Sequence, residues 1–208
     1  MEIVTWLSAN WLGLIGFISG LLCVWLLIRE NILTFPIGLL YSVITVVVMF
    51  NNKLYADVLL NLYYVLMNAY GWWFWLRGDI DRRHETEQVQ VAEMPKRLRL
   101  IVLVISLFGI GLMGWYFDNY TDADLAYPDS FTTTVSFVAM WMSAHKYLES
   151  WLLWFVVNVV SVGLYLLKAQ EDAQLYFYVG LYTVYIWMAV IGWRTWKAQM
   201  PPPRSLAA

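Results

Sequence analysis

Charged residues are scarce in this 208-residue sequence: they make up 13% of it, against 61% for hydrophobic residues. Soluble domains contain about 25% charged and about 45–50% apolar residues, so the composition excludes an ordinary soluble domain. Eleven of the charged residues lie between Arg77 and Arg99, which leaves long uncharged runs elsewhere. Seven membrane-spanning helices of about 20 residues would fill most of the chain and leave room only for short loops.

Cysteine and an excess of positive charge are also missing. Cys23 is the only cysteine, which excludes a disulfide framework. The net charge of −2 argues against nucleic acid as a partner. Glu2 stands where a cleaved signal would carry basic residues, so no cleaved signal is expected. The phosphate-cradling pattern G-x-x-x-x-G-K-[ST] is absent, and ATP-driven transport is therefore not expected.

The uncharged runs predict an all-helical integral membrane protein with seven transmembrane helices. A membrane β-barrel would alternate apolar and polar residues, whereas Leu100 to Phe117 is apolar almost throughout. The predicted spans lie near residues 11–28, 32–50, 54–76, 98–117, 131–147, 150–167 and 174–196.

Lysine and arginine predict the orientation of these spans, because cytoplasmic loops carry the excess of both. With the N-terminus outside, only Lys53 and Lys168 lie on the outer side. We therefore expect a multi-pass protein of the bacterial inner membrane, with the N-terminus outside and the C-terminus in the cytoplasm. The basic residues on the inner side would be Arg29, Arg77, Arg82, Arg83, Lys96, Arg97, Arg99, Lys146, Arg194, Lys197 and Arg204.

An internal repeat divides the chain. A shift of 121 positions places Tyr64 on Tyr185 and the segment 71–75 on 192–196, so the third and seventh spans are expected to be copies. Each copy would comprise three helices, and the fourth span would restore the direction of the chain. The repeats are therefore predicted to be parallel, as in transporters whose two halves are related by an axis along the membrane normal.

The repeat also predicts the segments of the chain. A slip of two residues places Glu30 on Glu149 and Phe35 on Trp154, which extends the repeat to the preceding helices. The expected segments are 1–76 for the first repeat, 77–129 for the cytoplasmic loop, linker helix and outer loop, 130–197 for the second repeat, and 198–208 for a cytoplasmic tail.

Candidate substrate-binding residues lie on stripes of three spans, where spacings of three and four residues place them on one helix face. Polar groups in hydrocarbon are costly, so these stripes should face the interior of the bundle. Aromatic planes together with amides suit a flat, cationic ring that carries hydrogen-bonding substituents. The candidates are Asn61, Tyr64 and Asn68 in the third span, Trp151, Trp154 and Asn158 in the sixth, and Tyr182 and Tyr185 in the seventh.

Other interpretations stay open for some of these groups. Hydrogen bonding between helices is an equal alternative for Asn68 and Asn158. Aromatic residues near helix ends are also typical of the interfacial belt or of core packing. We expect one of those two roles for Trp72, Trp75, Trp193 and Trp196.

The sequence predicts neither enzyme chemistry nor a metal or cofactor. Residues 109–114 read G-x-G-x-x-G, but they lie within an apolar helix without a preceding strand, so close helix packing explains them better than dinucleotide binding. His84 and His145 have no companions at metal-ligand spacing. The charged loop after the third span is interpreted as a solvated linker. No carboxylate lies at a helix centre, which favours facilitated diffusion over ion-coupled transport.

The segment from His145 to Asn158 closely resembles the signature of the PnuC family of bacterial vitamin transporters. Its core is Trp-x-x-Trp-x-x-x-Asn, formed by Trp151, Trp154 and Asn158. The third span adds a second match from Leu54-Tyr55-Ala56 to Gly71-Trp72 and Trp75, with Asn68 where family members commonly carry an amide.

This resemblance implies a SWEET-like fold, in which two parallel three-helix repeats are joined by a linker helix (3+1+3) and the substrate lies between the halves. It implies a homotrimer that imports a vitamin, above all nicotinamide riboside, by facilitated diffusion. A cytoplasmic vitamin kinase would then trap the substrate by phosphorylation.

Three departures from familiar nicotinamide riboside transporters bear on the substrate. The chain is shorter, its seventh span is rich in Tyr and Trp, and Tyr41 stands where an Asn is often seen. Tyr41 therefore joins the candidate binding residues, and thiamine, another aromatic cation, remains the alternative substrate. A SWEET-like sugar transporter is a more distant alternative, and a membrane enzyme or sensor would need a cluster of catalytic groups.

Overall fold

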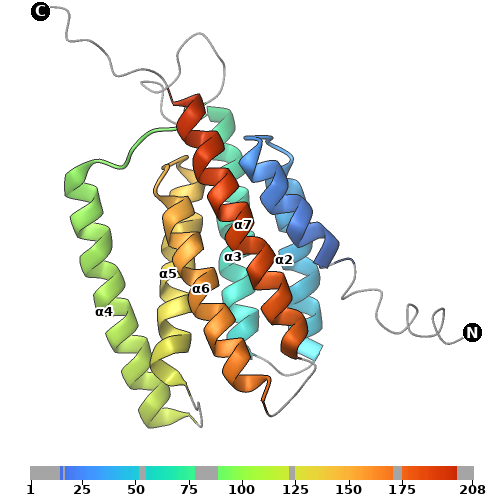
Figure 1. Ribbon diagram of the computed structural model, residues 1–208, viewed down its shortest axis with the longest axis vertical. Coiled ribbons are helices and arrows are strands. Elements are labelled where there is room, and N and C mark those ends of the chain that lie inside the picture. The colour runs from blue at the N-terminus through green and yellow to red at the C-terminus, as the bar shows by residue number, and fades with distance from the viewer. Residues whose placement is uncertain are drawn as a thin grey trace, which may run out of the picture. The chain divides into compact units, whose positions relative to one another are not determined.

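A computed structural model describes residues 15, 17–51, 55–77, 89–121, 125–170 and 175–200, and nearly all of these residues are helical. The described part of the chain contains a helix seen over Phe17–Ile28 and six further helices (Figure 1): α2 (Thr34–Asn51), α3 (Tyr55–Arg77), α4 (Lys96–Tyr120), α5 (Ala126–Ala144), α6 (Ser150–Lys168) and α7 (Tyr176–Gln199). Several predictions lie outside the described residues: the start of the first span at 11, the tail at 201–208, and those made for Glu2, Lys53, Leu54, Arg82, Arg83, His84 and Arg204.

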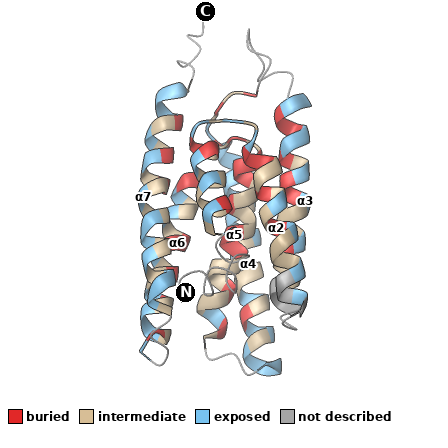
Figure 2. Cartoon of the chain, turned by 90° about the vertical axis from the view of Figure 1, so that its right-hand side faces the viewer, coloured by how far each residue is buried: buried red, intermediate tan, exposed pale blue. Residues whose placement is uncertain are grey.

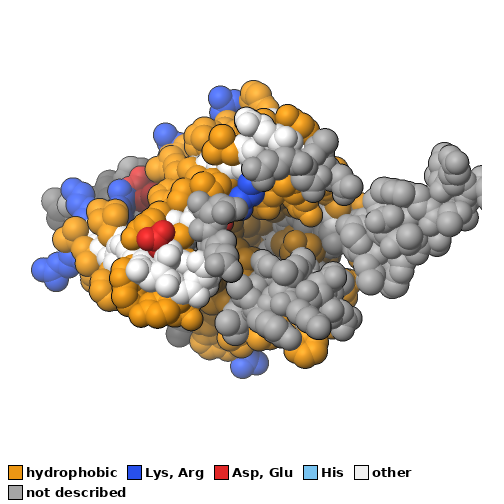
Figure 3. Space-filling view, turned by 90° about the horizontal axis from the view of Figure 1, so that it is seen from below, with side chains coloured by type: hydrophobic (Ala, Val, Ile, Leu, Met, Phe, Trp, Pro, Cys, Tyr) orange, Lys and Arg blue, Asp and Glu red, His pale blue; other side chains and the backbone are white. Residues whose placement is uncertain are grey.

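Three of the described helices have the length and composition of membrane-spanning elements. Helices α4, α6 and α7 are long and apolar enough to cross a membrane, and shorter apolar stretches are found at Phe17–Ile28 and within α2 at Thr34–Val47. Large hydrophobic side chains are exposed, such as Phe108 of α4 at 70%. Exposed and intermediate residues predominate along α7 (Figure 2), and hydrophobic side chains cover much of the described surface seen from one end (Figure 3). Exposed apolar surface of this extent fits contact with lipid.

The chain separates into two compact units, Met1–Gly78 and Asp79–Ala208. In the first unit, α2 packs against α3. The helix before α2 is tied to its start by two hydrogen bonds: the Thr34 hydroxyl donates to the Cys23 carbonyl at 2.8 Å, and the Cys23 thiol donates to the Thr34 carbonyl at 3.3 Å. These bonds hold the first turn of α2 against the preceding helix.

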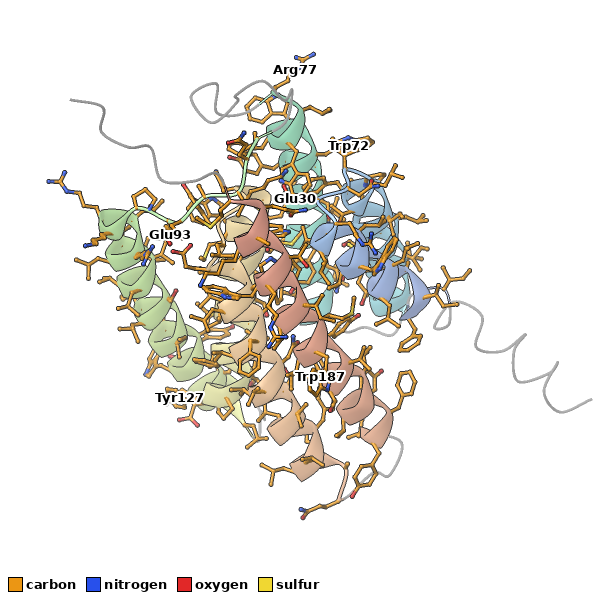
Figure 4. All side chains as sticks on the ribbon, turned by 45° about the horizontal axis from the view of Figure 1, so that its top comes forward. Glu30, Trp72, Arg77, Glu93, Tyr127 and Trp187 are labelled. Carbon is orange, nitrogen blue, oxygen red and sulfur yellow. The ribbon has the colours of Figure 1, made fainter. Side chains whose placement is uncertain are left out.

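The second unit contains α4 to α7, each packed against the next along the chain. Glycine permits close approach at the α4–α5 contact, because a Cβ on Gly114 would collide with the ring of Tyr127. Figure 4 shows Tyr127 at the beginning of α5. An ion pair of 3.4 Å between Lys168 and Asp129 joins the end of α6 to the first turn of α5.

The start of α5 differs from the prediction. A span near 131–147 was expected, whereas α5 runs from Ala126 to Ala144. The prediction counted Asp129 with the outer loop, but an acidic residue is favoured in the first turn of a helix, and proline, here Pro128, is tolerated there. The helix therefore begins before both residues rather than after them.

Two turns, at residues 29–35 and 145–151, follow the same backbone path. Each contains a residue in the left-handed region, Glu30 at φ 50° and Lys146 at φ 53°. Around Glu30, two backbone hydrogen bonds form the Schellman arrangement that ends many helices. All six backbone hydrogen bonds of the first turn recur 116 positions later in the second. The two turns are thus equivalent in backbone structure.

This equivalence corrects the alignment expected for the first helices of each repeat. The prediction that Glu30 matches Glu149 and Phe35 matches Trp154 was wrong, because the turns place Glu30 on Lys146 and Phe35 on Trp151. The left-handed position usually carries glycine. Neither turn has glycine at that position, so the sequence did not indicate which residues of the two turns are equivalent.

An extended segment, residues 89–95, runs into α4 and pairs with the turn between α5 and α6; we call it the strap. The Ala92 amide donates to the Lys146 carbonyl at 3.1 Å, and the Leu148 amide donates to the Ala92 carbonyl at 3.0 Å. The side chains of Val89, Val91 and Met94 are at most 2% exposed. This part of the expected solvated linker is therefore packed and hydrogen-bonded.

The carboxylate of Glu149 fastens the strap. It accepts the Met94 amide at 3.0 and 3.2 Å and forms an ion pair with Arg99 in the first turn of α4. Arg99 also bonds to the Met94 carbonyl at 2.8 Å and to Glu93 at 3.3 Å. Figure 4 shows Glu93 on the segment that leads into α4. The strap thus links α4 to the turn between α5 and α6.

Candidate functional site

The stripe of α3 lies in the first unit and is largely buried. Asn61 is 6% exposed, Asn68 is 4% exposed, and Tyr64 is half-buried. The Asn68 amide donates to the Tyr64 carbonyl at 2.8 Å. Its oxygen lies against Gly38 of α2, where a Cβ would collide with it. Glycine at 38 therefore makes the space that Asn68 occupies between the two helices.

Tyr41 is a half-buried residue of α2, three positions after Gly38. Its carbonyl accepts the Thr45 hydroxyl at 2.9 Å, within the same helix. The binding role expected for Tyr41 stays a prediction.

The stripe of α6 begins at Trp151, which is only 2% exposed. A Cβ on Gly192 of α7 would meet the middle of the Trp151 indole. The ring meets that of Trp196 edge to face, with centroids 5.3 Å apart. The indole nitrogen is fully buried and has no hydrogen-bond partner in the described part of the chain. The Trp151 side chain thus packs between α6 and α7, in contact with Gly192 and Trp196.

The first unit contains the same packing at the equivalent positions. A Cβ on Gly71 of α3 would collide with the Phe35 ring, and the Phe35 and Trp75 rings meet at 88° with centroids 4.8 Å apart. Trp75 is 1% exposed and Trp196 is fully buried, which confirms core packing for these two tryptophans. In each unit, a glycine therefore leaves space for an aromatic ring from another helix. That ring also contacts the tryptophan that lies one turn after the glycine.

Trp154 lies one turn after Trp151 and is held differently. Its ring is half-buried, and the indole N–H donates to the hydroxyl of Ser143 on α5 at 3.1 Å. Further along α6, Asn158 and Ser161 are each 6% exposed. Neither side chain makes a hydrogen bond to another described residue. This face of α6 therefore offers an aromatic ring followed by polar groups that remain free to bind.

Tyrosines continue this face toward the end of α6. The Tyr165 ring is stacked on Tyr178 at 5.0 Å and on Tyr182 at 5.3 Å, with interplanar angles of 17° and 21°. Tyr182 meets Tyr185 at 70°, with centroids 6.2 Å apart. Three of these four tyrosines are on α7, which is packed against α6. The second unit thus places a row of aromatic rings beside the polar groups of α6.

The candidate residues of the three stripes carry no charge, and the charged groups around α6 lie at its two ends. Glu149 and Lys146 belong to the turn before α6, and Lys168 ends it. The described residues contain no group of three or more His, Cys, Asp or Glu side chains that would hold a metal ion. The chemistry that the stripes offer is ring stacking and hydrogen bonding without charge.

Sequence reasoning missed Ser143 and Tyr178. Ser143 precedes the α5–α6 turn, and its contact with Trp154 depends on how that turn folds. Tyr178 is one of many aromatic residues in α7, so composition alone did not distinguish it. A register based on the left-handed residue at 146 would have placed Ser143 at the end of α5, where it meets α6.

Comparison with known proteins decides the family. The family described as "Nicotinamide mononucleotide transporter" matches residues 10–198, which is most of the chain. This chain belongs to the nicotinamide mononucleotide transporter family. The match confirms the PnuC resemblance, and the family is one of membrane transporters rather than enzymes.

Members of the nicotinamide mononucleotide transporter family resemble this chain over most of its length. It is 31% identical to the nicotinamide riboside transporter PnuC of Escherichia coli K12, over 90% of this chain and 85% of that protein. It is 27% identical to the protein of the same name from Neisseria mucosa, over 90% and 72%. The riboflavin/roseoflavin transporter RibM of Streptomyces davaonensis is 25% identical, over 89% and 84%.

A solved structure shows the same fold. The crystal structure of the vitamin B3 transporter PnuC matches 95% of this chain and 85% of its own, with a TM-score of 0.73 and 24% sequence identity. The predicted all-helical membrane fold is therefore confirmed.

Proposed function

We propose that this protein imports nicotinamide riboside across the bacterial inner membrane. The observation that carries the proposal is the 31% identity to the E. coli nicotinamide riboside transporter over 90% of this chain. The family match over residues 10–198 includes all of the described helices up to the last residue of α7.

The face of α6 supports a substrate with a flat ring. Trp154 presents a half-buried indole, and Asn158 and Ser161 follow it with polar groups that make no hydrogen bond within the described chain. A pyridinium ring is attracted to an indole face, and amide and hydroxyl groups bind the edges of a carboxamide or a ribose. The nine residues predicted from the sequence remain the proposed contacts, with Trp154 and Asn158 contributing most.

The lack of charge on the stripes favours the riboside over its phosphorylated form. Proteins bind phosphate mainly with Arg, Lys or helix N-termini. The residues of α3, α6 and α7 that are proposed to face the ligand are all Asn, Ser, Trp or Tyr. A mononucleotide would have to leave its phosphate unpaired at a large desolvation cost.

Transport is proposed to be uncoupled. No carboxylate lies at the centre of α3, α6 or α7, where a proton or sodium ion would be bound together with the substrate. Phosphorylation of the riboside by a cytoplasmic vitamin kinase would make entry effectively irreversible. Accumulation of unmodified substrate in vesicles under an ion gradient, without a kinase, would contradict this mechanism.

The assembly is proposed to be a homotrimer of chains with a 3+1+3 arrangement of helices. The identical turns 116 positions apart and the two glycine–ring–tryptophan packings support the repeat. The distribution of lysine and arginine supports an outer N-terminus and a cytoplasmic C-terminus. Native mass spectrometry would test the trimer. A membrane-impermeant thiol reagent that labels Lys168→Cys but not Arg194→Cys in whole cells would support the orientation.

Binding measurements on the purified full chain test the substrate. Calorimetric titration should detect nicotinamide riboside and should show much weaker binding of nicotinamide mononucleotide. Thiamine, riboflavin and sucrose complete the set, because they represent the alternative vitamins and the sugar transporters. Absence of riboside binding, or preference for another of these compounds, would contradict the proposal.

Substitutions on α6 test the site. Trp154→Ala and Asn158→Ala should each weaken riboside binding by about ten- to a hundredfold, since each removes a buried stacking or hydrogen-bonding contact. Trp187→Ala is the matched control: Trp187 is 67% exposed on α7 and is marked in Figure 4. Normal binding by both α6 variants would show that the site lies elsewhere.

A further inference from the structure

The two tryptophans of α6 are fixed by different means. Trp151 is 2% exposed and enclosed by Gly192 and Trp196, so packing alone fixes its ring. Trp154 is half-buried, and the structure gives its indole one directional contact, the 3.1 Å hydrogen bond to Ser143. A half-buried ring that must receive a ligand on one face has fewer packing contacts to hold its rotamer. The hydrogen bond therefore has a part in orienting Trp154 that no hydrogen bond has for the Trp151 indole.

The hydroxyl of Ser143 is well suited to this part. An indole nitrogen only donates, so Ser143 must be the acceptor in the contact. The Ser143 hydroxyl in turn donates to the Ala139 carbonyl at 2.9 Å, and the residue is only 3% exposed. Its hydrogen is thus directed back into α5, and a lone pair is directed at Trp154. Water has little access to replace it.

The first unit provides an internal comparison. The turns are equivalent 116 positions apart, so Leu27 stands in place of Ser143 and Gly38 in place of Trp154. The first unit therefore has neither the hydroxyl nor the indole at these positions. The second unit thus has both the indole N–H of Trp154 and the serine that accepts its hydrogen bond. The first unit lacks that indole and has Leu27 in place of the serine.

We propose that Ser143 is a positioning residue for transport: its hydroxyl holds the Trp154 indole in the orientation that stacks on the heteroaromatic ring of the substrate. This inference rests on the proposed function, because it takes nicotinamide riboside as the ligand and Trp154 as a contact. Ser143 itself does not need to touch the substrate. Its effect is to fix the rotamer of the ring before binding, which reduces the entropy lost when the ligand stacks.

A double-mutant cycle on the full-length protein tests the inference, with affinity for nicotinamide riboside as the measured quantity. Ser143→Ala should weaken binding by about five- to tenfold, because it leaves the indole N–H without its acceptor and frees the ring. Trp154→Phe removes the N–H and keeps an aromatic ring. In the Trp154→Phe background, Ser143→Ala should have no further effect, because the bond that it breaks is already absent.

Two further variants separate positioning from a general structural role. Ser106→Ala on α4 removes a serine that also donates to a carbonyl one turn back, at 2.7 Å, and it should bind normally. Ser143→Thr keeps the hydroxyl and should retain most of the affinity; if Ser143→Ala does not fold, the contrast between Ser143→Thr and Trp154→Phe provides the test.

The outcomes distinguish this inference from the proposed function. Normal binding by Ser143→Ala, or an equal loss in the presence and absence of the indole N–H, would overturn the positioning role alone. Failure of the unaltered protein to bind nicotinamide riboside would overturn the proposed function and, with it, this inference.

Discussion

The turns at residues 29–35 and 145–151 share a backbone but differ in what supports them. Both end a helix with a left-handed residue and begin the next helix with the same hydrogen bonds. In the second turn, the strap pairs with the backbone, and Glu149 fastens it. The equivalent of Glu149 in the first turn is Leu33, which is 53% exposed. The first turn thus has no acidic side chain at this position. The second turn has the same backbone structure, and its acidic side chain, Glu149, anchors the strap.

The two turns therefore share their local hydrogen bonds and differ in their tertiary contacts. The Schellman bonds satisfy the carbonyls at the helix end in both cases. The second turn has an added ionic contact, because Glu149 reaches Arg99 of α4 as well as the strap. The residues that follow this turn include Trp154 and Asn158, so the support lies at the base of the proposed binding face.

The largest effect that tests this comparison is expected at the two equivalent glycines. Gly192→Ala would press a methyl group onto the middle of the large Trp151 indole, which is 2% exposed and also meets Trp196. Gly71→Ala would meet the outer edge of the smaller Phe35 ring. We expect Gly192→Ala to lower the free energy of unfolding by about 2–3 kcal/mol and Gly71→Ala by about 1 kcal/mol, after the gain in helix propensity is included.

Thermal unfolding of both variants in the same detergent measures this difference. Replacing Trp151 by Leu in the Gly192→Ala protein should recover part of the loss, because the smaller side chain makes room for the methyl group. If Gly192→Ala is as stable as the unaltered protein, the packing of Trp151 on α7 has been misjudged.

A second prediction concerns the fastening of the strap. Glu149→Ala removes the ion pair with Arg99 and the acceptor of the Met94 amide, in a side chain that is 18% exposed. We expect a loss of about 1–2 kcal/mol, since the bonds are assisted by charge and partly shielded from water. The amides of Ala92, Met94 and Leu148 should then exchange hydrogen faster.

Two variants sharpen this prediction. Arg99→Gln removes the ion pair and the hydrogen bond to the Met94 carbonyl, but both are made by a more exposed side chain and the carboxylate still accepts the Met94 amide, so its effect should be the smaller one. Leu33→Ala at the equivalent position of the first turn should leave exchange in the strap unchanged. Unaltered exchange at Ala92 and Met94 in Glu149→Ala would mean that backbone pairing alone holds the strap.

Prediction from sequence succeeded where a boundary is marked by chemistry. Helix α6 was expected at 150–167 and runs from Ser150 to Lys168, because charges at both ends of an apolar run define it. Gly71 and Gly192 precede tryptophans at the same distance in the sequence, and in the structure each of the two glycines packs against a large ring. These features depend on residues close together in the chain.

Prediction failed where the deciding contact is tertiary or lacks its usual residue. The left-handed positions carry Glu30 and Lys146 instead of glycine, so the register of the first helices was shifted by three residues. The strap was interpreted as a solvated linker, because nothing in its sequence reveals the pairing of Ala92 with the α5–α6 turn. The role of Trp151 in packing α6 against α7 was hidden for the same reason: its partner Gly192 lies 41 positions away.

The smallest expected effect tests whether the two turns are as alike in energy as they are in geometry. Glu30→Gly and Glu30→Ala both remove the side chain, but only glycine adopts a positive φ without strain. The glycine variant should therefore be more stable than the alanine variant by about 1 kcal/mol. Lys146→Gly and Lys146→Ala should differ by the same amount, even though the loss of the Lys146 side chain, which is 1% exposed, should make both variants less stable than the unaltered protein. Comparing glycine with alanine at one position cancels the side-chain loss, so thermal unfolding of the four variants isolates the backbone strain. Equal gaps at 30 and 146 would support one shared turn energy, whereas a gap at only one position would show that the similar φ angles conceal different strain.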